Sequence, residues 1–429
     1  MRNNHFDVLI IGGGAAGLMA AVELVKAGKK TAILEARNRL GGRIHSFEND
    51  DFTIPVELGA EFVHGDLKIT QMLVKKAGTG LQKINGSLWQ KGKNGLQEQE
   101  DFIEDFNLLE KKFKEVKEDI PVSEFIKQHL QGEEFDKVRI TIQNYVEGYY
   151  AADINKASTL ALCEELTTSD DMQYRIEGGY KKLIDYLYNE ADQRGCIFYL
   201  SQPVKSINWQ KNKIEVITTA KTFLSSKLLV TVPLGVLQSE TITFSPALPN
   251  KMAEAKNLGF GPVIKLLLQF DKAFWREQDL TQQKDLKKFS FLFSDEPIPT
   301  WWTQFPDQVP LLTGWLGGPH AEKLKNDSDE EILQKALQTL EAIFSIQQSR
   351  IKQWLKAWKI INWMNDRYSN GAYAYEVVNG KMSREILNQP VDNTLFFAGE
   401  ALHSGPEIGT VEAALISGHQ TAQSLIASF

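Results

Sequence analysis

The sequence predicts an α/β fold, in which a Rossmann-like dinucleotide-binding domain is interleaved with a second domain of the α+β class. Three observations support this prediction. The chain opens with an apolar run that ends in closely spaced glycines, an amphipathic helical pattern occupies 102–118, and strand-like runs fill residues 260–320. With 429 residues the chain is too long for one simple core, so two or three domains are expected.

The composition is that of an ordinary globular protein, with 42% hydrophobic and 24% charged residues. The net charge of -7 and the lack of a basic stretch argue against nucleic acid as a partner, because phosphate binding needs a dense basic surface. Cys163 and Cys196 cannot form a disulfide framework or a zinc ligand set, which favours the reducing cytoplasm. Neither end of the chain has the roughly 20 apolar residues that cross a bilayer, so no membrane association is expected.

The first element is the largely apolar run 6–11, typical of a parallel strand that is covered on both faces. Gly12, Gly14 and Gly17 follow in the pattern G-x-G-x-x-G, at the start of a helix expected to reach about residue 26. These glycines would allow a tight turn, the approach of a pyrophosphate, and close packing of helix on strand. The N-terminus of the helix, where Ala16 lies, supplies free N–H groups and a partial positive charge.

The second strand, KTAILEA, ends at Glu35, which is placed to accept hydrogen bonds from the ribose hydroxyls of an adenosine. A carboxylate here repels a 2′-phosphate, so NADP is disfavoured. A glycine-rich turn without a ligand is the alternative, but the order strand, glycines, helix, strand and glutamate favours a dinucleotide site. Directly afterwards, RNRLGGRIHS supplies a second glycine turn, and Arg43 within it can neutralise a pyrophosphate.

The pattern E-A-x-x-R-L-G-G-R after a dinucleotide motif resembles the FAD-binding signature of the flavin amine oxidase superfamily, which includes monoamine oxidases, polyamine oxidases and flavin histone demethylases. The resemblance covers nearly the whole chain and implies FAD as cofactor. VELGAEFVHG (56–65) is similar to the loop that passes the flavin ring, QPVKSINWQ (202–210) to the strand that meets the adenine, and the segment 395–422 to the C-terminal FAD motif. Beside the first glycines, the residues that the resemblance assigns to FAD are Glu35, Ala36, Arg37, Gly42, Arg43, Gly59, Ala60, Glu61, Val204, Gly399, Glu400, Thr410 and Val411.

The C-terminal motif also has a physical interpretation. Residues 395–398 predict a strand, and 410–423 predict a helix whose N-terminus can face the flavin carbonyls. Ala372 occupies the position at which monoamine oxidases carry the cysteine that binds FAD covalently. The resemblance therefore implies that FAD is non-covalent.

Lys265 interrupts the apolar run GPVIKLLLQFD (261–271). One interpretation is an edge strand that directs the lysine to water. The resemblance supports another, because in this superfamily a lysine on such a strand is hydrogen-bonded through a water to the hydride-accepting nitrogen of the flavin. Strand alternation places Lys265 on one face with Val263 and Leu267.

Relatives enclose the substrate amine between two aromatic side chains, and the resemblance aligns Tyr373 with one of them. Thr410 stands where the second is expected, so the cage is half open and fits a polyamine-like or secondary amine. Trp363 is expected to pack against the flavin, although a plain core position would also bury it. His64 matches a histidine near the substrate nitrogen of animal-type polyamine oxidases and could accept a hydrogen bond there; a structural loop histidine is the alternative.

Two further sets of residues have open interpretations. Glu61, Glu147 and Asp153 could form an acidic approach for polyamines, but ordinary surface carboxylates are the preferred interpretation. Two tryptophan pairs are interpreted as core residues rather than as a cage, namely Trp301 with Trp302 and Trp354 with Trp358.

The order of the motifs implies a discontinuous FAD-binding domain made of residues 1–65, 172–245 and 385–429. Residues 66–171 and 246–384 would form the substrate domain, with helices at 102–118 and within 122–165. A helix is expected at 328–344, capped by Ser328 or Asp327. No unbroken heptad array exists for the coiled-coil tower of one histone demethylase branch, which argues against a chromatin role.

The resemblance implies FAD-dependent amine oxidation, with hydride transfer from the amine α-carbon to flavin, hydrolysis of the imine, and reoxidation by oxygen with release of hydrogen peroxide. A small-molecule amine and oxygen are the expected partners. A flavin L-amino-acid oxidase or desaturase of the same fold is one alternative; the oxidase would need an arginine to clamp the substrate carboxylate, and Arg139, Arg175 and Arg367 are candidates. A non-catalytic flavin-binding redox sensor is the other. The sequence leaves the oligomeric state open.

Overall fold

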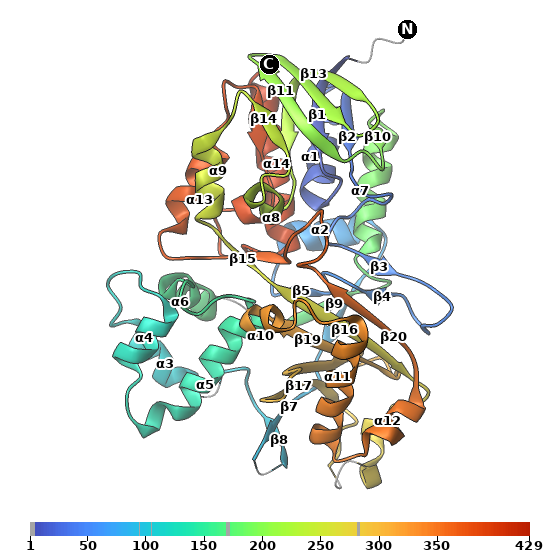
Figure 1. Cartoon of the computed structure of the whole chain (residues 1–429), viewed down its shortest axis with the longest axis vertical. Helices are drawn as coiled ribbons and strands as arrows, with labels where there is room; N and C mark the ends of the chain where they lie inside the picture. Colours follow the sequence, from blue (N-terminus) through green and yellow to red (C-terminus); the bar gives the residue numbers. More distant parts are fainter. Residues whose placement is uncertain (1–4, 94, 104, 169–171, 281–283) are drawn as a thin grey trace.

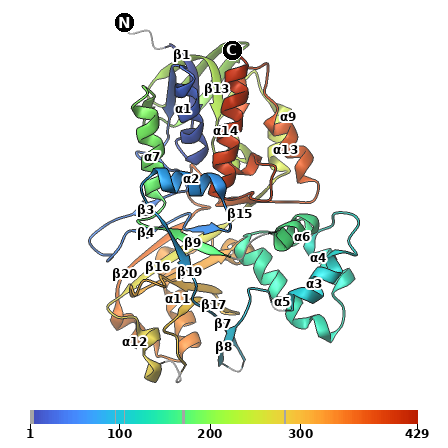
Figure 2. The same ribbon diagram turned by 180° about the vertical axis from the view of Figure 1, so that it is seen from behind.

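The structure is a computed structural model of the whole chain, and it describes residues 5–93, 95–103, 105–168, 172–280 and 284–429. The elements form two tiers (Figure 1). The upper tier is a sheet covered by helices. The lower tier contains a second sheet with its own helices and, beside it, a separate helical lobe. Seen from behind, α1, α14 and α7 cover one face of the upper sheet (Figure 2).

The upper sheet has the strand order β10-β2-β1-β13-β12-β11-β14, with β22 paired to β13. Its first part is parallel, as the opening apolar run predicts, and side chains of β1 alternate between two buried clusters, Val8 and Ile10 in one and Leu9 and Ile11 in the other. The strands are β1 (His5–Ile11), β2 (Thr31–Leu34), β10 (Ile197–Tyr199), β11 (Val204–Gln210), β12 (Lys213–Thr218), β13 (Thr222–Val230), β14 (Thr243–Ser245) and β22 (Leu395–Phe397).

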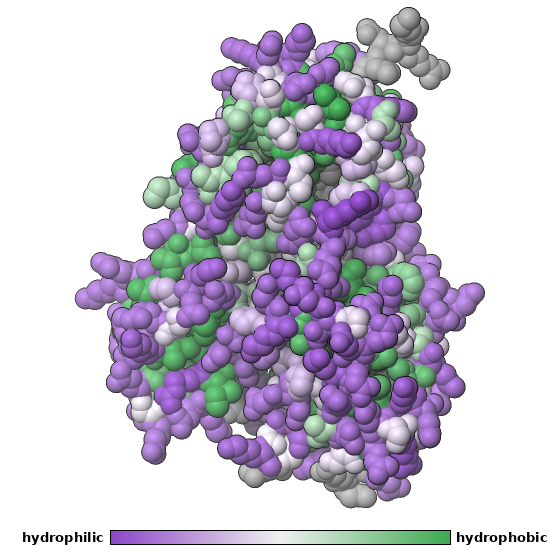
Figure 3. Space-filling model, viewed as in Figure 1, coloured by the Kyte–Doolittle hydropathy of each residue, from purple (hydrophilic) through white to green (hydrophobic). Residues whose placement is uncertain are grey.

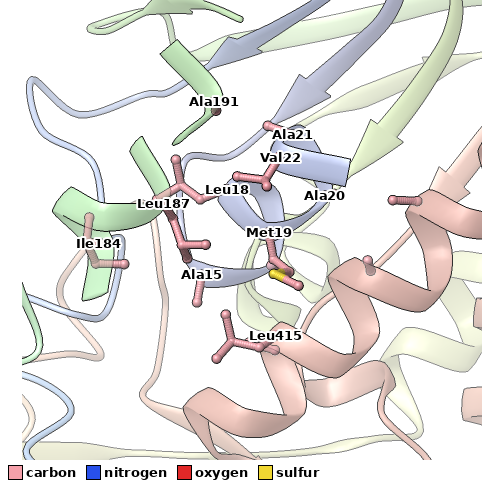
Figure 4. Close-up of a cluster of buried hydrophobic side chains, with 14 of the residues drawn as sticks. Ala15, Leu18, Met19, Ala20, Ala21, Val22, Ile184, Leu187, Ala191 and Leu415 are labelled. Carbon is pink, nitrogen blue, oxygen red and sulfur yellow. The ribbon is translucent and has the colours of Figure 1, made fainter. Parts of the chain in front are cut away.

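Helix α1 is the centre of the upper core. Figure 4 shows Ala15, Leu18 and Met19 of this helix between Leu187 of α7 and Leu415 of α14. Small residues on α1 let its neighbours approach closely, so the glycine-bearing end of the helix is held rigidly. The helices of this tier are α1 (Ala15–Lys26), α2 (Lys68–Lys76), α7 (Lys181–Asp192), α8 (Leu234–Gln238), α9 (Pro249–Lys256), α13 (Gly380–Asn388) and α14 (Val411–Ala427).

The lower sheet has the order β20-β16-β19-β18-β17-β7-β8, so β16 is paired on both sides. On β16, the side chains of Ile264, Leu266 and Leu268 belong to the core beneath α11. Those of Val263 and Leu267 lie on the opposite face of the strand, as alternation predicts. The elements are β7 (Ser87–Gly92), β8 (Gly95–Gln99), β16 (Val263–Phe270), β17 (Phe289–Ser294), β18 (Thr300–Thr303), β19 (Leu311–Gly317), β20 (Leu355–Asn362), α10 (Gly318–Lys323), α11 (Asp329–Phe344) and α12 (Gln348–Trp354).

The cap of α11 confirms one of the two predicted residues. Ser328 accepts a hydrogen bond from the N–H of Glu331, and the Glu331 carboxylate accepts one from the N–H of Ser328 at 2.8 Å, which completes a capping box. Asp327 is ion-paired with Lys335 instead.

The helical lobe contains α3 (Phe106–Phe113), α4 (Val122–His129), α5 (Asp136–Asn144), a π-helical turn (Tyr145–Tyr149) and α6 (Thr159–Thr168). The predicted helix at 102–118 is therefore too long. Asp105 has a left-handed φ of +56°, which starts the helix one residue later, and Phe102 packs instead on Phe291 and Phe293 of β17. Residue 104 of that prediction lies outside the described residues. Figure 3 shows a mainly hydrophilic face on which hydrophobic residues gather over this lobe.

Short strands lie between the tiers and connect them. They are β3 (Ser46–Phe47) with β4 (Val56–Glu57), β5 (Phe62–His64) with β9 (Gln173–Ile176) and β6 (Leu81–Ile84), and β15 (Gly259–Gly261) with β21 (Tyr373–Tyr375). Except for the β3–β4 pair, the sheets collect strands from distant parts of the chain. The predicted domain limits stay a prediction.

Candidate active site

The glycines between β1 and α1 form a cradle at the start of the helix. Gly12 has a φ of +109°, and a Cβ there would lie 2.7 Å from Thr231 Oγ1. A Cβ on Gly17 would overlap the carbonyl oxygen of Gly12, so only glycine lets α1 pack this closely on the strand. Around Gly14 the space is open, and no side chain caps the helix. The open backbone and the free N–H groups, with Ala16 in the first turn, fit the pyrophosphate of a dinucleotide.

Glu35 follows β2 at the edge of this cradle and is 4% exposed. Its carboxylate accepts hydrogen bonds from the N–H groups of Gly13 at 2.7 Å and Arg37 at 2.8 Å, which fix its orientation. Ala36 is half-buried, and the Arg37 guanidinium is paired with Asp366 at 2.5 Å. The carboxylate is therefore fixed at the edge of the cradle, and its contact with a ribose stays a prediction. Val204, assigned to the adenine, is half-buried at the start of β11.

Arg43 connects the cradle to the C-terminal motif. Its Nη1 donates to Glu400 Oε1 and to the carbonyl oxygen of Ala372, both at 2.6 Å, and Glu400 Oε2 accepts from the N–H of Ala374 at 3.3 Å. The sequence assigned Arg43 and Glu400 to the cofactor separately and did not predict their ion pair. Gly399 has open space beside it, which leaves room for a ligand.

The neighbouring positions of the second glycine turn pack against the same cradle. A Cβ on Gly42 would lie 3.6 Å from the Cα of Gly14, and the N–H of Ala60 donates to the carbonyl oxygen of Arg43 at 3.3 Å. Val411, the first residue of α14, is half-buried against the upper core. Segments from distant parts of the chain, around Gly14, Arg43, Ala60 and Glu400, thus meet beside the cradle.

One loop, residues 58–61, joins the cradle to the lower tier. A Cβ on Gly59 would overlap the carbonyl oxygen of Arg43 and lie 3.2 Å from Trp363 Cζ2, so the loop and the indole pack closely. Trp363 is 2% exposed, and its Nε1 donates to the carbonyl oxygen of Leu58 at 3.0 Å. Lys265 Nζ donates to the carbonyl oxygen of Gly59 at 3.2 Å. Trp363 and Lys265 therefore meet at the segment that the sequence predicts beside the flavin.

Lys265 is fully buried, with 0% exposure, on a strand that is paired on both sides. The edge-strand interpretation is therefore wrong. Its ammonium is paired with Glu61 Oε2 at 2.7 Å and lies 5.4 Å from the centre of the Trp302 ring. Burial alone would raise the pKa of Glu61, but Lys265 and Arg175 outweigh burial and lower it to about 2.

Arg175 of β9 completes this ion cluster. Its Nε donates to Glu61 Oε1 at 2.9 Å, and its two terminal nitrogens donate to the carbonyl oxygens of Thr303 and Phe305 at 2.8 and 3.1 Å. Trp302 Nε1 also donates to Glu61 Oε1, at 3.0 Å. The sequence named Arg175 only as a possible carboxylate clamp and Glu61 only as a cofactor or surface residue. No local pattern signals this pairing, because its members come from three separate segments.

The carboxylates proposed as an acidic approach are placed differently. Glu61 and Glu147 are buried, so the preferred interpretation as surface carboxylates is wrong for both. Glu147 faces His320 at 3.8 Å and Gln143 at 3.4 Å, whereas Asp153 is half-buried and faces Lys156. The tryptophans are core residues as interpreted, with Trp301 and Trp302 buried and with Trp354 and Trp358 packed on the lower core.

Tyr373 opens β21, and its ring stacks on Trp315 with centroids 6.4 Å apart and planes inclined by 16°. Its hydroxyl donates to the carbonyl oxygen of Tyr149, and burial raises the pKa of both tyrosine hydroxyls. Thr410 caps α14 by accepting from the N–H of Ala413 at 3.2 Å. Thr410, which stands at the position of the second aromatic side chain in the predicted cage, is thus a small residue whose hydroxyl caps α14.

His64 ends β5, and its ring packs edge-on against Tyr149 with centroids 5.3 Å apart. Burial lowers the pKa of the imidazole to about 4, although a hydrogen bond with Gln173 acts in the opposite direction. The ring is therefore neutral at neutral pH. Its Nδ1 is buried and has no hydrogen-bond partner among the described residues, so it is open to a ligand.

Tyr149 belongs to a cluster of tyrosines that the sequence did not predict. The cluster lies on and just after the π-helical turn. The rings of Tyr145, Tyr149 and Tyr150 pack on one another with centroids 4.9 to 5.7 Å apart. Glu165 of α6 accepts hydrogen bonds from the hydroxyls of Tyr150 and Tyr145. Burial raises the pKa of Glu165 to about 7, and its charge raises the pKa of both Tyr149 and Tyr373. We call Tyr145, Tyr149, Tyr150 and Glu165 the tyrosine cluster.

Two other kinds of site are not found in the part of the chain that the structure describes. No group of three or more His, Cys, Asp or Glu side chains there is arranged to hold a metal ion. Over the same ranges, no helix is both long enough and apolar enough to cross a membrane.

Comparisons with known proteins agree with this arrangement. Polyamine oxidase 3 of Oryza sativa subsp. japonica is 29% identical over 98% of this chain and 90% of its own length. Lysine-specific histone demethylase 1 homolog 3 of Arabidopsis thaliana is 27% identical over 98% of this chain, which spans only 30% of that protein. Among solved structures, putrescine oxidase bound to putrescine has a TM-score of 0.80 at 19% identity, with 99% of each chain covered. Cyclohexylamine oxidase from Brevibacterium oxydans IH-35A has a TM-score of 0.78 at 18% identity, covering 98% of this chain and 99% of its own.

The two structural likenesses concern the fold, in which an FAD-binding part and a substrate-binding part are interleaved. The family model for flavin containing amine oxidoreductase matches residues 15–426, and Gly17, Glu35 and the loop at Gly59 lie within that match. The chain therefore belongs to the flavin containing amine oxidoreductases and is an FAD-dependent oxidoreductase.

Proposed function

We propose that this enzyme oxidises a polyamine-like or secondary amine and uses oxygen as the electron acceptor. Bound non-covalently, FAD supplies the redox chemistry, taking a hydride from the carbon next to the amine and returning two electrons to oxygen as hydrogen peroxide. The observation that carries the proposal is the meeting of Lys265, Trp363 and the loop at Gly59, with Tyr373 nearby on β21. These groups lie at the junction of the two tiers, where a ligand reaches both.

His64 would orient the reacting amine through a hydrogen bond. An imidazole whose pKa is lowered to about 4 carries no charge at neutral pH, and its unpartnered Nδ1 can exchange a hydrogen bond with an amine nitrogen. Tyr373 would form one wall against the substrate, held by its stacking on Trp315 and by the bond to Tyr149. Thr410 in place of a second aromatic ring favours a substituted nitrogen.

The tyrosine cluster supports a substrate with a second positive charge. Tyrosine faces attract ammonium groups through cation–π interactions, and a buried carboxylate strengthens that attraction. Among the described residues, Glu165 is hydrogen-bonded to the hydroxyls of Tyr145 and Tyr150 and not to a cation. A diamine or polyamine could place its reacting nitrogen near His64 and Tyr373 and its second ammonium at the cluster.

An L-amino-acid oxidase is less well supported, because the three arginines considered have other partners. Arg175 is committed to Glu61 and two carbonyl oxygens. Arg139 donates to the carbonyl oxygens of Leu130 and Gly132, and Arg367 is exposed beside the Tyr368 ring. A desaturase or a redox sensor of the same fold would need no amine site at all, so the experiment below separates them.

The two thiols, Cys163 and Cys196, are free, and we propose a cytoplasmic location on that basis. We further propose that the partners are limited to small molecules, namely the amine and oxygen, without nucleic acid, since the net charge is -7.

The test is to record the flavin absorption band anaerobically while amines are added one class at a time. We expect diamines, polyamines or secondary amines to bleach the band, and air to restore it with release of hydrogen peroxide. Bleaching by amino acids alone would instead support the amino-acid oxidase. A flavin that no amine or amino acid bleaches would point to the desaturase or the sensor.

A further inference from the structure

We propose that Glu61 and Arg175 are positioning residues that act through Lys265, keeping it charged and fixed for the reaction of the reduced enzyme with oxygen. This inference rests on the proposed placement of Lys265 beside the flavin. It goes beyond the proposed function, because nothing in that function requires a carboxylate or an arginine behind the lysine.

The carboxylate of Glu61 is held by more donors than a simple ion pair requires. Its Oε2 accepts from Lys265 at 2.7 Å. Its Oε1 accepts from Arg175 Nε at 2.9 Å, from Trp302 Nε1 at 3.0 Å and from Gln304 Nε2 at 3.5 Å. Arg175 in turn is anchored to two backbone carbonyl oxygens. The side chain of Glu61 therefore has one orientation, and that orientation fixes the Lys265 ammonium.

The ion cluster of Lys265, Glu61 and Arg175 also carries a net charge. Two cations and one anion leave a net charge of one positive unit in a buried place. Lys265 also interacts with Glu57 of β4, whose pKa is raised to about 7 mainly by burial. The register partners of Lys265 on β19 and β20 are Trp315 and Ile361, neither of which is charged. Glu61 is thus the group that balances the buried ammonium.

The chemical consequence concerns reoxidation. Oxygen takes two electrons and two protons from the reduced enzyme and leaves as hydrogen peroxide, and the negative charge that develops on oxygen is stabilised by a nearby fixed cation. Without Glu61, the buried ammonium faces Arg175 with no anion between them, and it loses its proton more readily. The rate of reoxidation in a variant without Glu61 would then depend on pH, which the rate in the wild-type enzyme does not.

The experiment compares Glu61→Gln, Lys265→Met and the double variant. Each flavin is reduced by light with EDTA, without any amine, and mixed with oxygen between about pH 8 and 10 in a stopped-flow instrument, a range in which the Glu57 carboxyl stays ionised. We expect a flat profile for the wild type and for Lys265→Met, with Lys265→Met at least about tenfold slower. Glu61→Gln should fall by up to tenfold per pH unit above its new ionisation. The double variant should match Lys265→Met and lose that ionisation, because Glu61 acts only through the lysine.

A flat profile for Glu61→Gln, or a double variant slower than Lys265→Met, would overturn the inference. Trp302→Phe is the matched control, because it removes one donor to Glu61 and leaves every charge in place; its profile should stay flat. If Glu61→Gln does not retain FAD, Arg175→Gln carries the test. It reduces the net charge of the cluster to zero and should slow reoxidation without a new ionisation, and an unchanged rate would refute the role of Arg175.

The titration of apoprotein with FAD, followed by flavin fluorescence, gives a readout apart from reactivity. The positioning role predicts similar affinities for Glu61→Gln and the wild type, whereas a purely structural role would weaken both FAD binding and reoxidation. Light reduction also separates this inference from the proposed function. If no amine bleaches the flavin but the pH profiles follow the pattern above, the cluster works as inferred and the amine assignment fails.

Discussion

Replacing Glu165 by glutamine tests the substrate class directly. The Glu165 carboxylate lies beside Tyr145 and Tyr150, and its charge reaches Tyr149 and Tyr373. Glutamine preserves the shape of the side chain and can keep hydrogen bonds to the tyrosines, but it cannot attract an ammonium group by charge. The variant should therefore lose affinity for diamines and keep its activity toward monoamines.

The size of the effect follows from the charge of this half-buried carboxylate. Hydrogen bonds to charged groups contribute about 1.5–3 kcal/mol, which corresponds to a loss of about ten- to a hundredfold in kcat/KM for the diamine. The pKa of about 7 adds a pH signature, because the free enzyme carries the charge only above that pH. The ratio of diamine to monoamine kcat/KM should fall by about tenfold per pH unit below about pH 7 in the wild type, and stay constant in Glu165→Gln.

Glu165→Gln should raise the free energy of unfolding at high pH, although it lowers the activity toward diamines. The pKa of Glu165 is higher in the folded protein, about 7, than its ordinary value of 4.5, so the ionised form destabilises the fold as pH rises through this window. A difference of roughly 2.5 pH units corresponds to about 3 kcal/mol, which glutamine would recover at pH 8 and not at pH 4. Urea unfolding at both pH values measures this difference.

The kinetic assay uses a diamine and a monoamine of equal chain length. Glu164→Gln is the matched control, since Glu164 is the exposed neighbour on the same helix, and it should leave both substrates unaffected. Equal losses for both amines in Glu165→Gln would refute the assignment of the tyrosine cluster to a second ammonium. If Glu164→Gln lowered kcat/KM for the diamine by the same factor, the effect would come from surface charge and not from the tyrosine cluster.

Three further outcomes are expected. Gly17→Ala would drive a Cβ into the carbonyl oxygen of Gly12, so the protein should elute from gel filtration without the yellow flavin band, whereas an intact band would contradict the close packing of α1. Ser328→Ala removes the cap of α11 and should lower the free energy of unfolding by about 1 kcal/mol in urea, with FAD content unchanged. Glu61 contributes stability that is complete above about pH 4.5 and is lost as pH falls toward its pKa of about 2, so Glu61→Gln should flatten the acid limb of the stability curve followed by circular dichroism.

Local patterns predicted the elements whose signals lie within a few residues of one another. The strand, glycines and helix of the cradle, the alternation along β16 and the Ser328 cap were all recognisable in this way. The helix at 102–118 failed because periodicity does not reveal a single residue such as Asp105 with left-handed backbone geometry. Helix ends depend on such details more than helix centres do.

The sequence singled out individual residues of the candidate site but not the contacts among them. Motifs singled out Lys265, Glu61, Arg43 and Glu400, yet the ion pairs among them join positions hundreds of residues apart. A sequence also does not show which of many tyrosines pack around one half-buried carboxylate, and so the tyrosine cluster was missed. Charge pairing and burial are tertiary properties, and they decide what each motif residue can do.

The parallel pairing of β13 with both β1 and β22 has a consequence for biosynthesis. His5 pairs with the position of Leu224, and Leu228 with that of Leu395, while α14 packs on α1. A nascent chain therefore cannot close the upper sheet until the segment 395–427 has left the ribosome, and until then the apolar edges of its early strands need protection by chaperones. Loading of FAD is accordingly expected to follow translation.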